Sequence, residues 1–258
     1  IIPDTIEGNP VTSIGDEAFS RCWGLTNITI SNGVTSIGTS SFWSCTGLTS
    51  IAIPETVTSF GEGAFSGCSS LTSITIPGSI TSIADYGFYN CSSLTSITIP
   101  DSVASIGRSA FSGCTALTRI TLRGNAPTLG WDVFLNIATG ARAYVADEFA
   151  ESFGGFGSTW EGLVVRSEIS DLAYTTTNGE VIITDCDDAA TGELILPDTI
   201  GGNPVTSIGD NAFEFCTSLT SIAIPESVTS IGKEAFLQCT SLTSITIPFG
   251  VISIGDEA

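Results

Sequence analysis

Cysteine is the residue type with the most chemical potential in this 258-residue chain. A reactive or metal-binding thiol needs a base or further ligands nearby, and the chain has no histidine and no Cys-x-x-Cys pair. We therefore predict a ladder of buried thiols that bond neighbouring backbone, with disulfides between adjacent units as the alternative. The ladder comprises seven cysteines that share one repeat position: Cys22, Cys45, Cys68, Cys91, Cys114, Cys216 and Cys239. Cys186 lies outside this register, and we expect it to be exposed.

A run of carboxylates beside Cys186 is the second group with metal-binding potential. Asp185, Asp187 and Asp188 lie close together in sequence, and carboxylate oxygens are ligands for Ca²⁺. Their spacing matches no complete calcium-binding loop, so we favour a solvated acidic turn. The three aspartates remain a weak Ca²⁺ candidate, and we expect no other metal site.

The overall composition argues against catalysis and against nucleic-acid binding. The chain has 27 Asp and Glu residues against 7 Lys and Arg, and its net charge of −20 repels phosphate backbones. The lack of histidine removes the usual general base, and no nucleophile–base pair or phosphate-binding glycine loop is visible. We expect no enzyme activity, no cofactor and no nucleic-acid partner. Apolar stretches are too short for a membrane span in this segment.

The elements that position these residues are repeats of 23 residues. A sixth unit, from Ala126, keeps the 23-residue spacing although its sequence diverges, and a ninth unit is cut off after Ala258. Five consecutive units start at Val11, Val34, Val57, Ile80 and Val103, and two more start at Val205 and Val228. A period of this length indicates a stack of small units that bury a shared core.

Each unit predicts one short strand and one turn. In the third unit Leu71, Ile74 and Ile76 form an L-x-x-I-x-I pattern, whose alternation indicates a strand with one buried face. Pro77 ends that strand, because proline cannot donate to a ladder. Ala64, Phe65 and Cys68 are spaced for one helical turn. The fold class is thus a repeat solenoid with a parallel sheet on one side and turns or helical turns on the other.

A longer period divides the chain. Residues 1–64 align with 195–258 at a constant offset of 194, which predicts a first array over 1–148 and a truncated second array over 171–258 that begins with a hairpin at Asn178-Gly179. We infer a fragment of a longer tandem protein. The junction, 149–170, is rich in glycine and aromatic residues. We favour an aromatic plug over the end of the first core, with an exposed ligand platform as the alternative.

Polar residues between the buried positions of the strands form the remaining candidate site. We expect them to face solvent. A soluble, β-favouring face is one interpretation, and a broad contact surface is the other. The Thr-x-Thr pairing of ice-binding solenoids is not reproduced. The candidates are Thr26, Asn27, Thr29, Thr49, Ser50, Thr72, Ser73, Thr75, Thr95, Ser96, Thr98, Thr118, Arg119 and Thr121.

The motif I-x-x-x-A-F-x-x-C-x-x-L-x-x-I-x-I-P resembles the BspA-like leucine-rich repeats of bacteria and protists. The resemblance covers almost all of residues 11–148 and 193–258 and implies a leucine-rich-repeat stack with no catalytic residues. It also implies a secreted or surface-displayed protein that adheres to proteins or cells. We therefore expect an extracellular or cell-surface scaffold with a protein or cell-surface ligand. The alternative is a structural protein whose arrays self-assemble into a fibre, sheath or coat.

Overall fold

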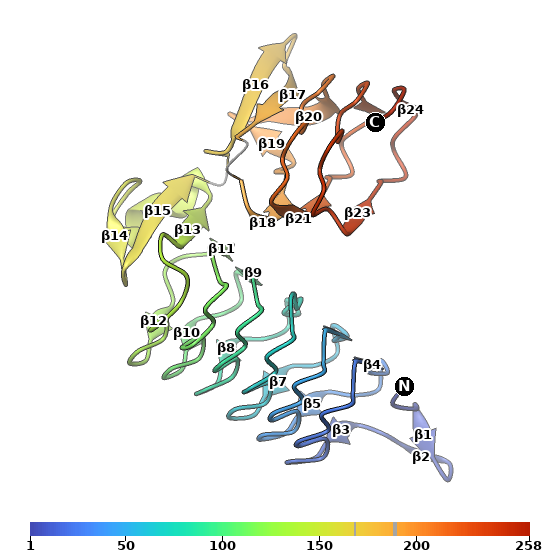
Figure 1. Ribbon diagram of the computed structural model, residues 1–258, viewed down its shortest axis with the longest axis vertical. Helices are drawn as coiled ribbons and strands as arrows, with labels where there is room; N and C mark the ends of the chain where they lie inside the picture. The colour runs from blue at the N-terminus through green and yellow to red at the C-terminus, as the bar shows by residue number, and fades with distance from the viewer. Residues whose placement is uncertain (168, 188–189) are drawn as a thin grey trace. The chain divides into compact units, whose positions relative to one another are not determined.

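The computed structural model describes residues 1–167, 169–187 and 190–258, which form two compact units. Unit 1 spans residues 1–166 and unit 2 spans residues 167–258, so the division lies within the predicted junction 149–170. Each unit is a stack of coils, drawn from blue to yellow for unit 1 and from yellow to red for unit 2 in Figure 1. Parallel pairing of strands 23 residues apart confirms the predicted repeat solenoid.

Two rows of parallel strands run along unit 1. The first row pairs Ser82 with Ser105 and Ile83 with Ile106, and the same register recurs along the row. Its strands are β3 (Ser13–Ile14), β5 (Ser36–Ile37), β7 (Ser59–Phe60), β8 (Ser82–Ile83), β10 (Ser105–Ile106) and β12 (Thr128–Leu129). The second row, which carries the candidate polar face, comprises β4 (Asn27–Thr29), β6 (Ser50–Ala52), β9 (Ser96–Ile99), β11 (Arg119–Leu122) and β13 (Arg142–Val145). A hairpin of β1 (Thr5–Ile6) and β2 (Asn9–Pro10) precedes both rows.

The third side of each coil is built of turns, and the predicted helical turn over residues 64–68 is not formed. The amides of Ala64, Ser66 and Cys68 bond carbonyls three residues earlier in their own coil. The intervening amides of Gly63, Phe65 and Gly67 bond carbonyls of the next coil. A helix needs every amide for its own ladder. Sharing alternate amides with the neighbouring coil therefore excludes a helix and ties the coils together on this side as well.

A column of phenylalanine rings fills the centre of unit 1. Phe42, Phe65, Phe88 and Phe111 are fully buried, one per coil. Together with Phe19 and Phe134 they stack with ring centroids 5.2–5.8 Å apart and planes within 8° of parallel. Because dispersion between well-packed rings accumulates along the column, each coil is stabilised by both its neighbours.

The second row of strands is interrupted at residues 71–77. A strand over residues 74–76 is predicted by the sequence, and the structure has no strand there. The Thr72 amide lies 3.4 Å from the Thr49 carbonyl and the Thr95 amide 3.3 Å from the Thr72 carbonyl, against 2.9 Å for the Thr49 amide and the Thr26 carbonyl. Ladder bonds this long are weak. The coils are therefore not joined by a regular ladder at this point, although Ile74 and Ile76 stay buried.

Aromatic residues close the last coil of unit 1. A 3₁₀ helix, η1 (Asp147–Phe153), ends at Gly154, which adopts the left-handed conformation with φ 90°. The following strands are β14 (Thr159–Trp160) and β15 (Leu163–Ser167), and β15 lies beside β13. Trp160 packs against Phe134, the last ring of the column, at 5.9 Å, and against the buried Phe153 at 5.0 Å. The aromatic side chains of this segment thus continue the core.

Unit 2 begins with a hairpin and continues as coils. Strands β16 (Leu172–Thr177) and β17 (Glu180–Cys186) are antiparallel around Asn178 and Gly179, whose φ angles of 54° and 81° fit a tight hairpin turn. One parallel row then joins β17 to β20 (Asn203–Ile208), β22 (Ser230–Ile231) and β24 (Ser253–Ile254), and β19 (Thr199–Ile200) pairs antiparallel with β20. The other row is β18 (Gly192–Ile195), β21 (Leu219–Ala223) and β23 (Ser244–Thr246).

The phenylalanine column should be a main source of stability in unit 1. We expect Phe88→Ala to lower the free energy of unfolding by about 3–5 kcal/mol, because the ring is fully buried and stacked on both faces. Urea denaturation followed by circular dichroism measures the change. The matched control is Phe156→Ala, whose ring is 47% exposed and should change stability little. Equal losses in the two variants would contradict this role.

Candidate binding surfaces

The polar face of the second strand row contains threonines that stabilise the stack itself. The hydroxyls of Thr49, Thr72 and Thr118 donate to the carbonyls of Thr26, Thr49 and Thr95, at 3.0, 3.4 and 3.3 Å. Each bond joins one coil to the preceding coil at the same repeat position. These hydroxyls are therefore occupied by the fold and are poor candidates for ligand contacts.

Other polar side chains on this face do not bond the neighbouring coil. Asn27, Thr29, Ser50, Ser73 and Thr75 are exposed, and their side chains make no hydrogen bond within the described part of the chain. Asn27 and Ser50 are direct neighbours in the register of β4 and β6. We refer to these five residues as the free polar face. They offer hydroxyl and amide groups of both donor and acceptor character to a ligand.

The expectation of solvent exposure is wrong at the far end of the same row. Ser96, Arg119 and Thr121 are buried, and Thr95 and Thr98 are half-buried. The cause lies in the sixth unit, where Tyr144 stands in register with Thr121, and the Arg119 guanidinium lies 3.6 Å from the centre of the Tyr144 ring. Such bulky side chains cover the small polar residues beside them.

The repeated cysteines form a ladder of thiol–carbonyl contacts. The Sγ atoms of Cys45, Cys68, Cys91 and Cys114 donate to the carbonyls of Phe19, Phe42, Phe65 and Phe88 at 3.0–3.2 Å, and Cys239 bonds Phe213 at 3.0 Å in the same way. The Cys216 thiol lies 3.9 Å from the Cys186 carbonyl. All eight cysteines are free thiols. Six of the seven ladder thiols, all except Cys22, thus bond a backbone carbonyl that precedes them in the chain by 26 or 30 residues.

Burial makes these thiols poor nucleophiles. It raises the pKa of Cys68 and Cys114 to about 12 and that of Cys239 to about 11, and it raises the pKa of Cys91 well above its usual range. The thiolate is the reactive form, so these four buried or half-buried thiols are poorly reactive near neutral pH.

Two cysteines differ from expectation. Cys22 occupies the ladder position but is exposed rather than buried. Cys186 is buried, and its expected exposure is wrong. The register between β16 and β17 shifts between Ala173 and Tyr174, and this irregularity turns Cys186, rather than Asp185, toward the core.

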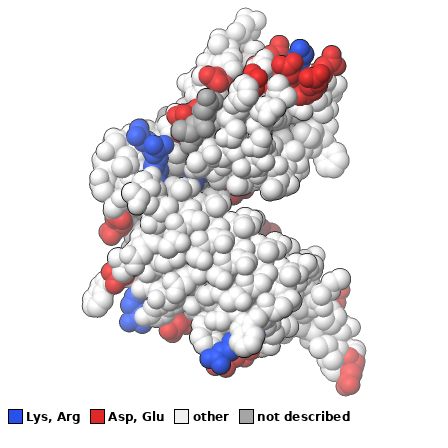
Figure 2. Space-filling model, in the orientation of Figure 1, with Lys and Arg blue, Asp and Glu red and all other residues white. Residues whose placement is uncertain are grey.

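Three aspartates at equivalent repeat positions accept backbone amides. Asp16, Asp85 and Asp210 accept the amides of Thr39, Arg108 and Lys233, each at 2.7 Å and each 23 residues further on. Charge on the face in Figure 2 gathers in small groups separated by uncharged surface. Some of the acidic residues therefore stabilise the contact between successive coils.

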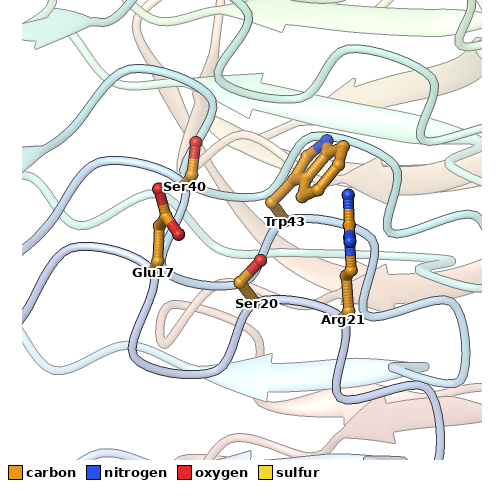
Figure 3. A pocket seen from close by; sticks show the side chains of 5 residues that line it. All are labelled: Glu17, Ser20, Arg21, Ser40 and Trp43. Atoms are coloured by element: carbon orange, nitrogen blue, oxygen red, sulfur yellow. The ribbon is translucent and has the colours of Figure 1, made fainter.

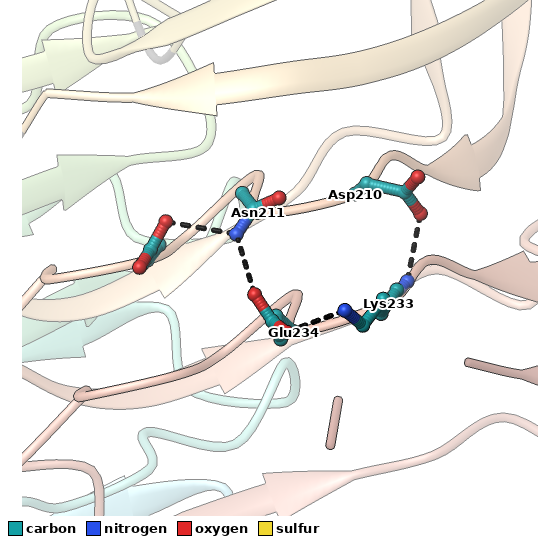
Figure 4. Close-up of polar contacts among 5 residues, drawn as sticks. Asp210, Asn211, Lys233 and Glu234 are labelled. Atoms are coloured by element: carbon teal, nitrogen blue, oxygen red, sulfur yellow. Dashed lines mark hydrogen bonds and ion pairs between the residues drawn. The ribbon is translucent and has the colours of Figure 1, made fainter. Parts of the chain in front are cut away.

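The acidic group around Asn211 in unit 2 is internally paired (Figure 4). The Asn211 amide donates to Glu214 at 2.8 Å and to Glu234 at 3.2 Å, and Lys233 lies 2.7 Å from Glu234. The hydrogen bond with Lys233 lowers the pKa of Glu234 and raises the pKa of Lys233. This network links two successive coils.

The predicted calcium candidate has limited support. Asp185 accepts the amide of Cys186 at 2.9 Å, Asp187 is exposed, and Asp188 lies outside the described residues. Among the residues that the structure describes, no three His, Cys, Asp or Glu side chains are grouped closely enough to hold a metal ion. The same part of the chain contains no helix of the length and hydropathy that a membrane span needs.

A hollow on the turn side of unit 1 was not predicted from the sequence (Figure 3). Glu17, Ser20 and Arg21 come from the first coil, and Ser40 and Trp43 from the second. The hollow measures about 440 Å³, and the Arg21 guanidinium lies 4.5 Å from the centre of the Trp43 ring. The available signal is a departure from the repeat: the other units of this array carry Ser44, Gly67, Asn90 and Gly113 where the first carries Arg21.

The raised thiol pKa values predict a loss of stability at alkaline pH. Unfolded thiols titrate near pH 8.5, whereas Cys68 and Cys114 hold their protons to about pH 12 in the fold. Between these values the unfolded chain releases protons that the folded chain keeps, so the free energy of unfolding falls as pH rises. We expect a loss of about 2 kcal/mol per buried thiol between pH 8 and pH 10.

Urea denaturation at pH 8, 9 and 10 measures this slope. Cys91→Ala is the matched variant: it should be less stable at pH 8 but should lose less stability on going to pH 10. An unchanged slope in this variant would show that the ladder thiols are not its source.

The repeat of this chain matches that of a known protein family. A family model described as the BspA type leucine rich repeat region, in six copies, matches residues 12–140 and 194–258. A comparison with curated proteins found no match.

Similar solved structures include bacterial repeat proteins. A leucine rich cell surface protein from Faecalibacterium prausnitzii A2-165 is 25% identical with a TM-score of 0.43, over 98% of this chain and 76% of that one. A leucine rich repeat protein of T. pallidum is 26% identical with a TM-score of 0.48, over 63% of this chain and 85% of that one. Since the family model covers most of the sequence, and the coils, the phenylalanine column and the thiol ladder repeat at its period, this chain belongs to the BspA-type leucine-rich-repeat family.

Proposed function

We propose that this chain is a non-enzymatic scaffold, displayed outside the cell, that binds another protein through the free polar face of unit 1. The observation that carries the proposal is the contrast within that face. The hydroxyls of Thr49 and Thr72 bond the preceding coil, whereas those of Ser50 and Ser73, one residue further along, are exposed and make no hydrogen bond among the described residues.

The chemistry of the free polar face suits a protein partner. Asn27, Thr29, Ser50, Ser73 and Thr75 carry no charge and extend across three successive coils, of which the first two are joined by pairing of β4 with β6 at a spacing of about 4.8 Å. A standard interface buries about 800 Å² on each partner and contains about ten hydrogen bonds. The free polar face would be the uncharged centre of such an interface, which avoids the cost of burying unpaired charge.

The thiols support a role that is neither catalytic nor dependent on a reducing compartment. Burial raises the pKa of Cys68, Cys91 and Cys114, so little thiolate is present to react with oxidants or substrates. Membership of a repeat-scaffold family points the same way. We propose that the sites of this protein are surfaces rather than reaction centres.

The proposal is tested by photo-crosslinking in the cells that produce the full-length protein. A benzoylphenylalanine in place of Ser73 should give a covalent adduct with a second protein species. The same group in place of Ala104, which is exposed near the first strand row, should give none. Ser50→Arg combined with Thr75→Arg should reduce the adduct from position 73 about tenfold, because the interface would have to bury two unpaired charges.

The control variant combines Thr46→Arg with Ala104→Arg, which adds the same charge at exposed positions away from the free polar face. It should leave the adduct unchanged, and both variants should keep the thermal midpoint of the parent. Equal adducts at positions 73 and 104 would contradict the proposal. An adduct with another copy of this chain would instead support assembly into a fibre, sheath or coat.

A further inference from the structure

The hollow lined by Glu17, Ser20, Arg21, Ser40 and Trp43 is the strongest candidate for a second binding site, and it lies on the turn side rather than on the free polar face. Figure 3 shows the two hydroxyls and the indole rising from neighbouring turns, with Arg21 beside the ring and Glu17 at the opposite end. Trp43, Ser20 and Ser40 are half-buried, and Glu17 and Arg21 are exposed. The site is therefore an open hollow with an aromatic wall.

Backbone geometry positions these side chains. Glu17, Arg21 and Ser40 adopt the left-handed conformation, with φ of 56°, 58° and 52°. That conformation is costly for residues with a Cβ atom. Glycine takes it at the matching positions of the third coil, Gly63 and Gly67. Other coils carry non-glycine residues at these positions with the same conformation, such as Tyr86 and Asn90, both with φ of 56°. The repeat therefore fixes the backbone here, and the first two coils differ in the side chains that this backbone presents.

The side chains of Glu17, Ser20, Arg21 and Ser40 make no hydrogen bond or ion pair with any residue that the structure describes. Arg21 stacks on Trp43 at 4.5 Å but has no carboxylate within ion-pair distance among the described residues. Stacking orients a guanidinium while its in-plane N–H groups stay available. Glu17 adds a carboxylate acceptor, and Ser20 and Ser40 add two hydroxyls whose bonds lie open to a ligand.

The charges of the hollow restrict the chemistry of its ligand. An anion would meet Glu17 and a chain of net charge −20, and a cation would meet Arg21. An uncharged ligand rich in hydroxyls can use both, donating to Glu17 and accepting from Arg21, while its C–H groups pack on the indole. We propose that this hollow binds a sugar ring of a neutral oligosaccharide.

A second hollow, which also has a carboxylate, an arginine and a tryptophan but no hydroxyl, supports an extended ligand. It measures about 360 Å³ and is lined by Asp85, Arg108 and Trp131 together with two glycines. Arg108 lies 4.8 Å from the centre of the Tyr86 ring and 3.9 Å from Asp85, and Trp131 is 82% exposed. At about 4.8 Å per coil the two hollows are roughly 17 Å apart along unit 1. A linear oligosaccharide could contact both, with Arg108 less available because of its ion pair.

The proposal stands independently of protein binding at the free polar face. Its test is an array of neutral, sialylated and sulfated oligosaccharides probed with the purified chain and with Trp43→Ala, Arg21→Ala and Trp23→Ala. Trp23 is the matched control, since it is 66% exposed in the first coil but does not line the hollow.

We expect the parent chain to bind one or more neutral oligosaccharides, and a fluorescence titration with the strongest of these to give dissociation constants. Trp43→Ala should weaken binding about tenfold, as expected for loss of an aromatic contact, while Trp43→Phe should retain part of the affinity. Arg21→Ala should weaken it several-fold, and Trp23→Ala should leave it unchanged. Circular dichroism establishes that each variant is folded.

Three results would overturn the proposal. The first is no binding to any neutral oligosaccharide. The second is binding confined to sialylated or sulfated members, which would make the hollow an anion site of Arg21. The third is equal affinity of Trp43→Ala and Trp23→Ala variants, which would place the sugar elsewhere.

Discussion

The structure depends on one constraint: each coil must lie on the next in a constant register of 23 residues. Strand rows hold two sides of the coil, and on the third side alternate amides cross to the neighbour. The phenylalanine column and the thiol ladder fill the interior at the same spacing, with Phe65 supplying both a ring to the stack and a carbonyl to Cys91. A single coil cannot bury its own apolar face, so stability arises between coils rather than within them.

This constraint also separates residues that build the stack from residues that are free to do something else. Some repeated positions bond one coil to another. They include the threonines that bond the preceding coil and the aspartates that accept a backbone amide. Two kinds of residue remain available for binding. The first are exposed residues whose side chains do not bond another coil, such as Ser50 and Ser73. The second are residues that depart from the repeat, such as Arg21 and Trp43.

Much of the fold could be predicted from the sequence, because the 23-residue period of the sequence equals the spacing between residues that pair in successive coils. The buried isoleucines, the phenylalanines and the seven ladder cysteines are identified by spacing alone. Details that depend on contacts between coils could not be read this way. The helical turn at residues 64–68 gives way to shared amides, residues 71–77 lack their strand, and Tyr144 covers part of the polar face. Cys186 is buried because of a register shift in the hairpin, which lies outside the 23-residue repeat. The hollow around Trp43 depends on side chains from two coils, which a pattern within one unit does not bring together.

The central claim is that hydrogen bonds join neighbouring coils on the turn side as well as along the strand rows, and native-state hydrogen exchange followed by NMR tests it most directly. The amides of Phe42, Phe65 and Phe88, which bond carbonyls of the next coil, should exchange only through global unfolding of unit 1. Their protection should equal that of Cys68 and Cys91, which bond within their own coil. Rapid exchange of the three phenylalanine amides, with protection confined to the strand rows, would contradict the account.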